Sequence, residues 1–89
     1  MNDNIKYMKF EKSSEECLND AMSIERKLSR YPIGQKLSRD DLKNECASEL
    51  DVDERITLNI WLSSKECTWV EKLISVNCTT MVGFVRTKV

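Results

Sequence analysis

The spacing of apolar residues predicts a helix in the first third of the chain. From Ser13 onwards apolar residues recur close to every 3.6 positions, and a serine followed by two glutamates is typical of a capped helix start. Pro32 should end the helix near Tyr31, because proline disfavours helical geometry in the residue before it. The side chains predicted to face inward are Cys17, Leu18, Ala21, Met22, Ile24 and Leu28.

A second helix is predicted to begin at Ser38. This serine is the expected N-cap, and Leu37 and Leu42 are spaced to form a hydrophobic staple around it. The acidic segment 51–53 should end the helix. Its predicted inward stripe consists of Leu42, Cys46, Ala47 and Leu50.

The segment 55–62 has two interpretations. Its apolar residues Ile56, Leu58, Ile60 and Leu62 alternate with other side chains, and this period of two favours a strand. The spacing from the preceding helix favours the second helix of a helix-turn-helix, with Ala47 where the two helices cross. On that template the apolar positions fall on Cys46, Leu50, Val52 and Ile60, and the remaining core position falls on Thr57, beside Ile56. If the segment is helical, Ile56 and Ile60 are expected to cover the core.

The C-terminal residues 67–89 are rich in Val, Ile, Thr and aromatic residues, with a polar interruption near Cys78, and they predict an antiparallel hairpin. The competing interpretation is a helix capped by Ser63 and Glu66. The predicted fold class is α+β: a small winged helix-turn-helix of three helices and a C-terminal hairpin. Its alternative is two helices packed on a three- or four-stranded antiparallel sheet. In the single domain 1–89, residues 1–12 would form an N-terminal arm or edge strand, and 13–66 the helical part.

One stretch resembles a known family. SRDDLKNECASELDVDERITLNIWLSS, followed by two β-rich runs, resembles the enterobacterial CaiF/GrlA-type winged-helix transcription regulators. The similarity lies in the S-R-x-D-[IL] helix opening and in a β-branched recognition helix that leads into a wing. It covers the last two-thirds of the chain. The resemblance implies that residues 55–63 are helical, that residues 68–88 form the wing, and that the protein regulates transcription.

Composition narrows the function classes. The 89 residues suffice for one domain, and the formal charge of −1 argues weakly against DNA binding, since DNA binders usually carry a basic excess. With no histidine and no C-x-x-C pair, neither an enzyme nor a metal site is expected, and no cofactor is expected either. The four cysteines are expected to be buried thiols rather than the disulfides of a secreted scaffold. The chain lacks the pattern of a signal peptide or a membrane span, so the cytoplasm is the expected compartment.

Two functions remain open. For a DNA-binding regulator, Arg55, Thr57 and Asn59 would read bases while the cations Lys65, Lys72, Arg86 and Lys88 would contact phosphates. The main objection is the acidic turn 51–54, which would repel phosphate unless its side chains cap the helix or pair with Arg55.

The alternative is a small protein-binding inhibitor or adaptor of phage or plasmid type. It would act through an acidic and apolar surface between Asp51 and Trp69, with Leu58, Trp61, Trp69, Asp53 and Glu54 in the interface. The expected partner is therefore double-stranded DNA or another protein, and the domain could also form a homodimer. For the two tryptophans, ordinary core packing is the competing interpretation.

Overall fold

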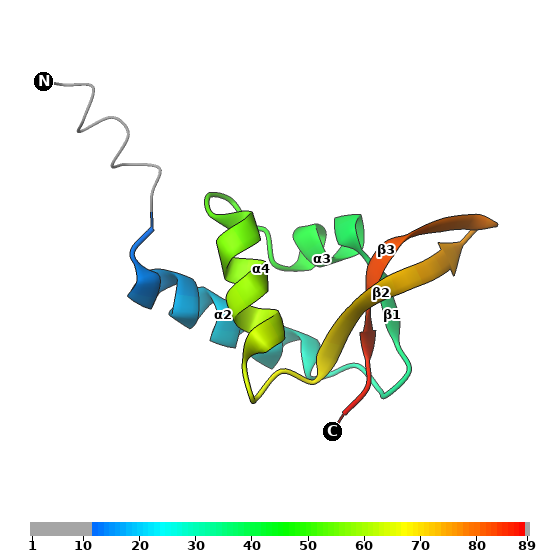
Figure 1. Ribbon diagram of the computed structural model, residues 1–89, viewed down its shortest axis with the longest axis horizontal. Coiled ribbons are helices and arrows are strands. Elements are labelled where there is room, and N and C mark those ends of the chain that lie inside the picture. The colour runs from blue at the N-terminus through cyan, green and yellow to red at the C-terminus, as the bar shows by residue number, and fades with distance from the viewer. Residues whose placement is uncertain (1–11, 89) are drawn as a thin grey trace, which may run out of the picture.

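The computed structural model describes residues 12–88 as one helix, a short strand, two further helices and a β-hairpin (Figure 1). The elements are α2 (Ser14–Leu28), β1 (Lys36–Ser38), α3 (Arg39–Glu45), α4 (Glu54–Ser63), β2 (Trp69–Val76) and β3 (Thr79–Arg86). The strands form an antiparallel sheet in the order β1-β3-β2. The fold is therefore α+β, with three helices and a C-terminal hairpin, and it is compatible with a winged-helix topology. The arm or edge strand predicted for residues 1–12 lies outside the described residues, except for Lys12.

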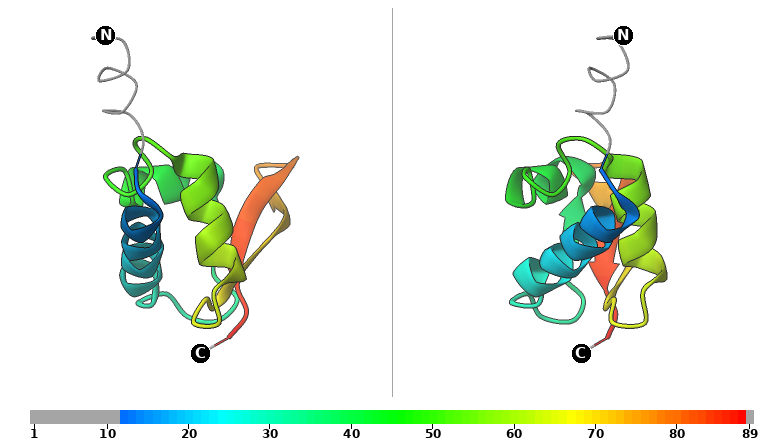
Figure 2. Two further views of the ribbon diagram at one scale, coloured as in Figure 1. Left: turned by 60° about the vertical axis from the view of Figure 1, so that its left-hand side comes forward. Right: turned by 90° about the vertical axis from the view of Figure 1, so that its left-hand side faces the viewer.

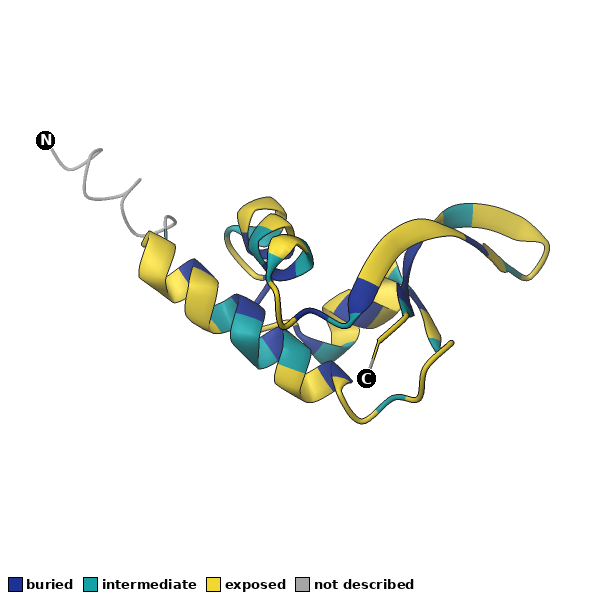
Figure 3. Ribbon diagram, turned by 60° about the horizontal axis from the view of Figure 1, so that its bottom comes forward, coloured by how far each residue is buried: buried dark blue, intermediate teal, exposed yellow. Residues whose placement is uncertain are grey.

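Helix α2 begins as its sequence predicts. The Ser13 hydroxyl accepts a hydrogen bond from the backbone N–H of Glu16, and the Glu16 carboxylate accepts one in return from the backbone N–H of Ser13, which completes a capping box. Most of the predicted inward face is buried, but Leu18 is exposed and Met22 only half-buried. Figure 3 shows the resulting stripe of buried positions along one side of the helix.

Strand β1 was not predicted from the sequence and lies directly before the predicted second helix, within the part 13–66 that was expected to be helical. Three residues are too few to show an alternation, and β1 forms because Leu37 pairs with Phe84 of β3. Gly34 turns the chain into this strand with a φ of 91°, a left-handed conformation that suits glycine. Main-chain bonds from Gly34 N–H to Arg86 O (2.8 Å) and from Arg86 N–H to Gln35 O (3.0 Å) extend the pairing.

Helix α3 is shorter than predicted. Ser38 caps it by accepting a hydrogen bond from the Asp41 N–H at 3.1 Å, as expected, but the helix ends at Glu45 rather than near Asp51. Residues 46–50 form turns in which Leu50 is buried and Ala47 is exposed. Ala47 is therefore not the point where the two helices cross, and Val52 is exposed rather than part of the core.

Residues 54–63 form the helix α4, so the template spacing predicted this segment correctly and the local alternation did not. Thr57, Leu58 and Trp61 share one face and are buried, while Ile56 is 52% exposed. The expectation that Ile56 and Ile60 would cover the core is thus wrong for Ile56, and Ile60 is only half-buried against it. A helical repeat brings residues three and four apart onto one side, and the core selects that side.

The hairpin of β2 and β3 confirms the predicted C-terminal pair of strands. Asn77 and Cys78 form its tight turn with φ values of 51° and 66°. The hairpin extends well beyond the helices (Figure 1), and α4 lies between α2 and the hairpin (Figure 2). Its base is buried through Trp69 and Phe84, whereas most of its outer part is exposed (Figure 3).

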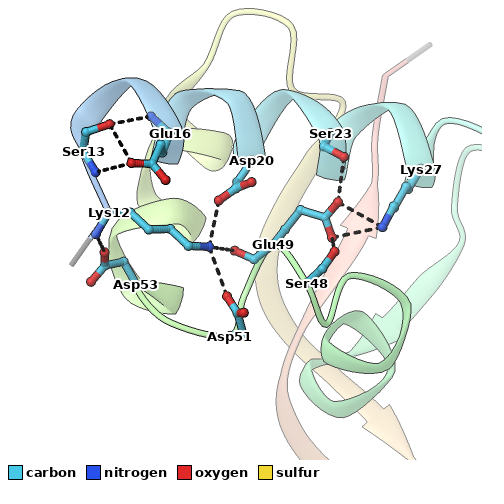
Figure 4. Close-up of polar contacts among 10 residues, drawn as sticks. All are labelled: Lys12, Ser13, Glu16, Asp20, Ser23, Lys27, Ser48, Glu49, Asp51 and Asp53. Atoms are coloured by element: carbon cyan, nitrogen blue, oxygen red, sulfur yellow. Dashed lines mark hydrogen bonds and ion pairs between the residues drawn. The ribbon is translucent and has the colours of Figure 1, made fainter. Parts of the chain in front are cut away.

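Two polar clusters fasten α2 to the turn between α3 and α4 (Figure 4). The Lys12 ammonium contacts Asp20 Oδ2 at 2.8 Å, Asp51 Oδ1 at 3.1 Å and the Glu49 carbonyl at 3.3 Å. Hydrogen bonding to Asp20, followed by that to Asp51, raises the pKa of Lys12. The Glu49 side chain accepts hydrogen bonds from Ser23 Oγ (2.7 Å), Lys27 Nζ (3.0 Å) and Ser48 Oγ (3.0 Å). These contacts fix the turn on α2.

Acid should weaken the domain through Glu49. Burial raises the pKa of this carboxyl, but the hydrogen bonds from Ser23, Lys27 and Ser48 outweigh that effect and lower it from 4.5 to about 2. Because the folded-state pKa is depressed, the stabilisation is complete above pH 4.5 and is lost as the pH falls towards 2. We expect a loss of about 2 kcal/mol, less than the full shift implies, since Lys27 is 43% exposed to solvent.

Urea unfolding at several pH values between 5 and 2, for the wild type and Glu49→Gln, measures this contribution. The variant should lose much of the dependence on pH, whereas Glu15→Gln on the exposed first turn of α2 should keep it. An identical pH dependence in Glu49→Gln and the wild type would contradict the assignment.

Candidate nucleic-acid interface

The exposed face of α4 carries the candidate site. Arg55, Ile56, Asn59 and Ser63 are the exposed residues of this helix. Arg55 and Asn59 are one turn apart, so both side chains leave the same side of the helix. The buried side of α4 holds Thr57 and Trp61, and the exposed residues consequently point away from the core.

An open cleft of about 200 Å³ lies beside this face, where α3, α4 and β2 meet. Leu58 and Leu62 supply its apolar lining, and the cations of Arg39 and Arg55 line it together with Asn59. Glu71 of β2 contributes a carboxylate to the same cleft. A cleft with several hydrogen-bond donors and two acceptor groups, the Asn59 amide oxygen and the Glu71 carboxylate, suits base edges, which present both kinds of group, better than it suits phosphate alone.

The acidic side chains that argue against DNA binding are engaged within the protein. Asp51 pairs with Lys12, and the Asp53 carboxylate accepts a hydrogen bond from the Lys12 backbone N–H at 2.7 Å. Glu54 pairs with Lys43 at 3.1 Å and lies 3.6 Å from Arg39. These partners differ from Arg55, which the sequence offered as one way to neutralise the acids, and Asp53 is the N-cap residue of α4 without a side-chain cap. The intramolecular pairs reduce the repulsion that a phosphate would meet.

Two predicted DNA contacts are wrong. Thr57 is fully buried, because it occupies the core-facing side of α4, so its side chain cannot reach a base. Arg86 is occupied by the fold: its guanidinium donates to the carbonyls of Ser29, at 2.7 Å, and Tyr31, and its Nε donates to Thr68 Oγ1 at 3.2 Å. Arg86 therefore connects β3 to the end of α2 rather than clamping a phosphate.

Replacing Arg86 by methionine tests this structural role. Because the variant keeps the apolar stem but loses three hydrogen bonds to a charged group, we expect the free energy of unfolding to fall by about 2 kcal/mol. Chemical denaturation measures the loss. Lys88→Met, two residues further along an exposed stretch, should change the stability by no more than about 0.5 kcal/mol. If Arg86→Met is as stable as the wild type, Arg86 has no structural role and its guanidinium is again a candidate phosphate contact.

The remaining predicted phosphate contacts are three exposed lysines, and they belong to three different segments of the chain. Lys65 follows α4, Lys72 lies on β2, and Lys88 follows β3. The wing carries Lys72 as its one exposed cation within β2 and β3. Arg39 in the cleft was not among the predicted site residues. From the sequence, Arg39 is only the first residue of a predicted helix. Its place near α4 becomes evident from its ion pair with Glu54 and from its position in the cleft.

The apolar centre predicted for a protein interface is part of the core. Leu58, Trp61 and Trp69 are all buried, and Trp61 packs against Phe84 with ring centroids 5.6 Å apart. The Trp61 Nε1–H donates to Glu25 Oε1 at 3.0 Å, and Glu25 also accepts bonds from the backbone and hydroxyl of Thr68. Both tryptophans therefore follow the competing interpretation, ordinary core packing.

The cysteines are all free, and three of them are buried. Burial raises the pKa of Cys46 to about 11, which keeps that thiol protonated and unreactive near neutral pH. Cys78 departs from the prediction, because it is exposed in the turn of the hairpin. Within residues 12–88, no three Cys, Asp or Glu side chains are grouped so that they could hold a metal ion. In that same part of the chain, no helix has the length and apolar character that crossing a bilayer requires.

Comparison with known proteins adds no relative. No protein-family model, curated protein or solved structure matches this chain. The resemblance to CaiF/GrlA-type regulators therefore stays a prediction from the sequence, and function has to be inferred from the chain's own residues.

Proposed function

We propose that this protein binds double-stranded DNA as a winged-helix regulator of transcription, with α4 in the major groove. The observation that carries the proposal is the exposed face of α4, on which Arg55 and Asn59 lie one turn apart. Both side-chain types form paired hydrogen bonds with base edges. In helix-turn-helix proteins the second helix of the pair lies in the major groove, and here that helix is α4.

Electrostatics supports the proposal more than the net charge of −1 suggests. The acids next to α4 are paired with Lys12, Lys43 and Arg39, so their charges are partly compensated. Lys65, Lys72 and Lys88 are exposed and would contact phosphates on either side of α4. Since few cations are free, we expect binding that is weak on random DNA and clearly dependent on salt.

Fluorescence anisotropy with a labelled random-sequence duplex, at several salt concentrations, tests the proposal. The double variant Lys65→Ala, Lys72→Ala should bind more weakly, and the slope of log affinity against log salt should fall by about 2, since about one counterion is released per phosphate contact. The matched double variant Arg26→Ala, Lys36→Ala removes two exposed cations from α2 and β1 and should keep the slope. If the wild type binds no duplex at micromolar protein and low salt, the proposal fails.

Protein binding is the second candidate function, and an exposed apolar pair on the wing favours it. Leu73 of β2 is 65% exposed and lies opposite Val82 of β3, which is 43% exposed. Exposed apolar side chains that adjoin one another mark interfaces more often than single exposed ones do. With Leu58 and both tryptophans buried, such an interface would be centred on the wing. Under this proposal the protein forms a stoichiometric complex, with a partner or a second copy, that Leu73→Lys disrupts. Light scattering measures the mass of the wild type and of Leu73→Lys. If both have the mass of a monomer, self-association through the wing is rejected.

A further inference from the structure

The exposed face of α4 carries a more specific inference, which rests on the proposed function and names the DNA that this helix would read. We propose that α4 recognises a short site in which a guanine and an adenine are about two base steps apart, with a thymine methyl group against Ile56. Arg55 would read the guanine and Asn59 the adenine. Ile56 would be a specificity-determining residue, which the sequence interpretation assigned to the core.

The spacing of guanine and adenine follows from helix geometry. Arg55 and Asn59 are four residues apart, which is about 6 Å along the helix axis. Stacked bases on one strand are about 3.4 Å apart, so the two side chains span about two base steps when the helix follows the groove. Arginine pairs best with the two acceptors of guanine, and asparagine with the acceptor and donor of adenine.

Ile56 is the exposed residue of this face that core packing does not explain. It is 52% exposed, although it belongs to a helix with three buried residues on its other side. It precedes Asn59 by three residues, so these two side chains are neighbours on the helix surface. Along the helix axis Ile56 stands between Arg55 and Asn59, although its side chain leaves the helix about 100° round from that of Arg55. The thymine methyl is the one apolar group that the bases present in the major groove, and a branched aliphatic side chain complements it.

Ser63, the remaining exposed residue of α4, is not available for base contact in the same way. Its hydroxyl donates to the carbonyl of Asn59 one turn back, and it also lies 3.4 Å from the carbonyl of Ile60. A serine bonded to its own helix has its donor occupied. The reading surface of α4 is consequently the trio Arg55, Ile56 and Asn59.

Selection of duplexes from a random library by the wild-type protein tests the inference. The enriched sequences should contain guanine and adenine about two steps apart, with thymine at or next to the intervening base pair. On the selected duplex, replacing that thymine by uracil, which lacks the methyl group, should weaken wild-type binding about fourfold. Ile56→Ala should bind the thymine and uracil duplexes equally well. Arg55→Ala and Asn59→Ala should each lose about tenfold in affinity and lose the preference at one position.

Matched substitutions elsewhere distinguish reading from general damage. Ile33→Ala removes an isoleucine of similar exposure, 55%, from the turn after α2, and it should keep the fourfold preference for thymine. Arg26→Ala and Asn19→Ala remove exposed residues of the same types from α2 and should leave the selected sequence unchanged. The unfolding curves of all these variants should stay near that of the wild type, because every substituted side chain is exposed.

The outcomes separate this inference from the proposed function. If the wild type enriches no sequence and binds no duplex at low salt, the DNA-binding proposal itself fails. If it binds with the expected salt dependence but Ile56→Ala keeps the preference for thymine over uracil, Ile56 does not read the methyl group. A selected site without the guanine and adenine spacing would overturn the assignment of Arg55 and Asn59, even with DNA binding intact.

Discussion

Replacing Trp61 by alanine is expected to remove about half of the domain's free energy of unfolding. Its side chain is fully buried, packs on Phe84 and donates a hydrogen bond to Glu25. Truncating a buried tryptophan typically costs about 3–5 kcal/mol, because contacts are lost and a cavity remains. A domain of 89 residues has a total stability of only about 5–10 kcal/mol, so about half of it would be lost.

Circular dichroism and urea unfolding measure this effect, and a graded series makes the result specific. Trp61→Phe keeps a ring against Phe84 but loses the N–H that donates to Glu25 and part of the volume of the indole, so it should cost about 2 kcal/mol, less than the alanine change. As a surface comparison, Leu18→Ala on the exposed side of α2 should cost much less. A Trp61→Ala protein that is as stable as the wild type would restore Trp61 as an interface anchor and refute its place in the core.

Gly83→Ala is expected to be the most damaging single-methyl change in the sheet. Gly83 pairs with Ser38 on one side and Lys72 on the other, in the middle of β3. A Cβ at this position would lie 2.4 Å from Ile74 Cδ1 and 2.7 Å from the Leu37 carbonyl oxygen. The isoleucine could change its rotamer, but the backbone of β1 would have to move. We therefore expect a loss of about 3 kcal/mol, at the upper end of the usual cost of overpacking.

Thermal unfolding of Gly83→Ala, together with Gly83→Ala combined with Ile74→Ala, separates the two clashes. Removing the Ile74 side chain relieves the contacts at Cδ1 and Cγ1 but not the one with the Leu37 carbonyl. Because Ile74 is buried and its removal has a cost of its own, Ile74→Ala alone is the reference, and adding Gly83→Ala to it should cost less than adding Gly83→Ala to the wild type, but more than nothing. Gly34→Ala is the contrasting change. No atom lies within 4 Å of a Cβ there, and its cost of about 1 kcal/mol comes from the positive φ alone. Equal stability of Gly83→Ala and the wild type would contradict the close approach of β1 and β3.

For the candidate site, the fold changes which predicted residues can act together. Arg55 and Asn59 stay exposed on α4, as the DNA-binding hypothesis requires. The other predicted site residues that the fold removes from the surface are of two kinds. Arg86 is engaged in hydrogen bonds within the fold, and the buried ones are Thr57, Leu58, Trp61 and Trp69. The two functions considered from the sequence are affected unequally, because DNA binding keeps its central pair of side chains whereas the protein interface loses its apolar centre.

The sequence by itself determined the features that depend on neighbouring residues. A serine and glutamate three positions apart form the cap of α2, Pro32 follows four residues after the helix ends, and Ser38 starts α3. These signals act over one helical turn, so they can be read directly. The abundance of β-branched and aromatic residues on both sides of a polar interruption likewise identified the hairpin, because its two strands follow each other along the chain.

Only the tertiary structure decided the face of α4, the end of α3 and the existence of β1. The residues 55–62 fit both a strand and a helix locally, and the burial of Trp61 and Thr57 against the rest of the core selects the helix and exposes Ile56. Two further features depend on partners more than 20 residues away along the chain. These are the hydrogen bonds of the buried Glu49 with Ser23 and Lys27, and the pairing of β1 with β3. Such contacts form only once the chain is compact, and no local spacing encodes them. For the same reason the apolar pattern of residues 55–62 could not show which side chains of α4 would be exposed and free to bind.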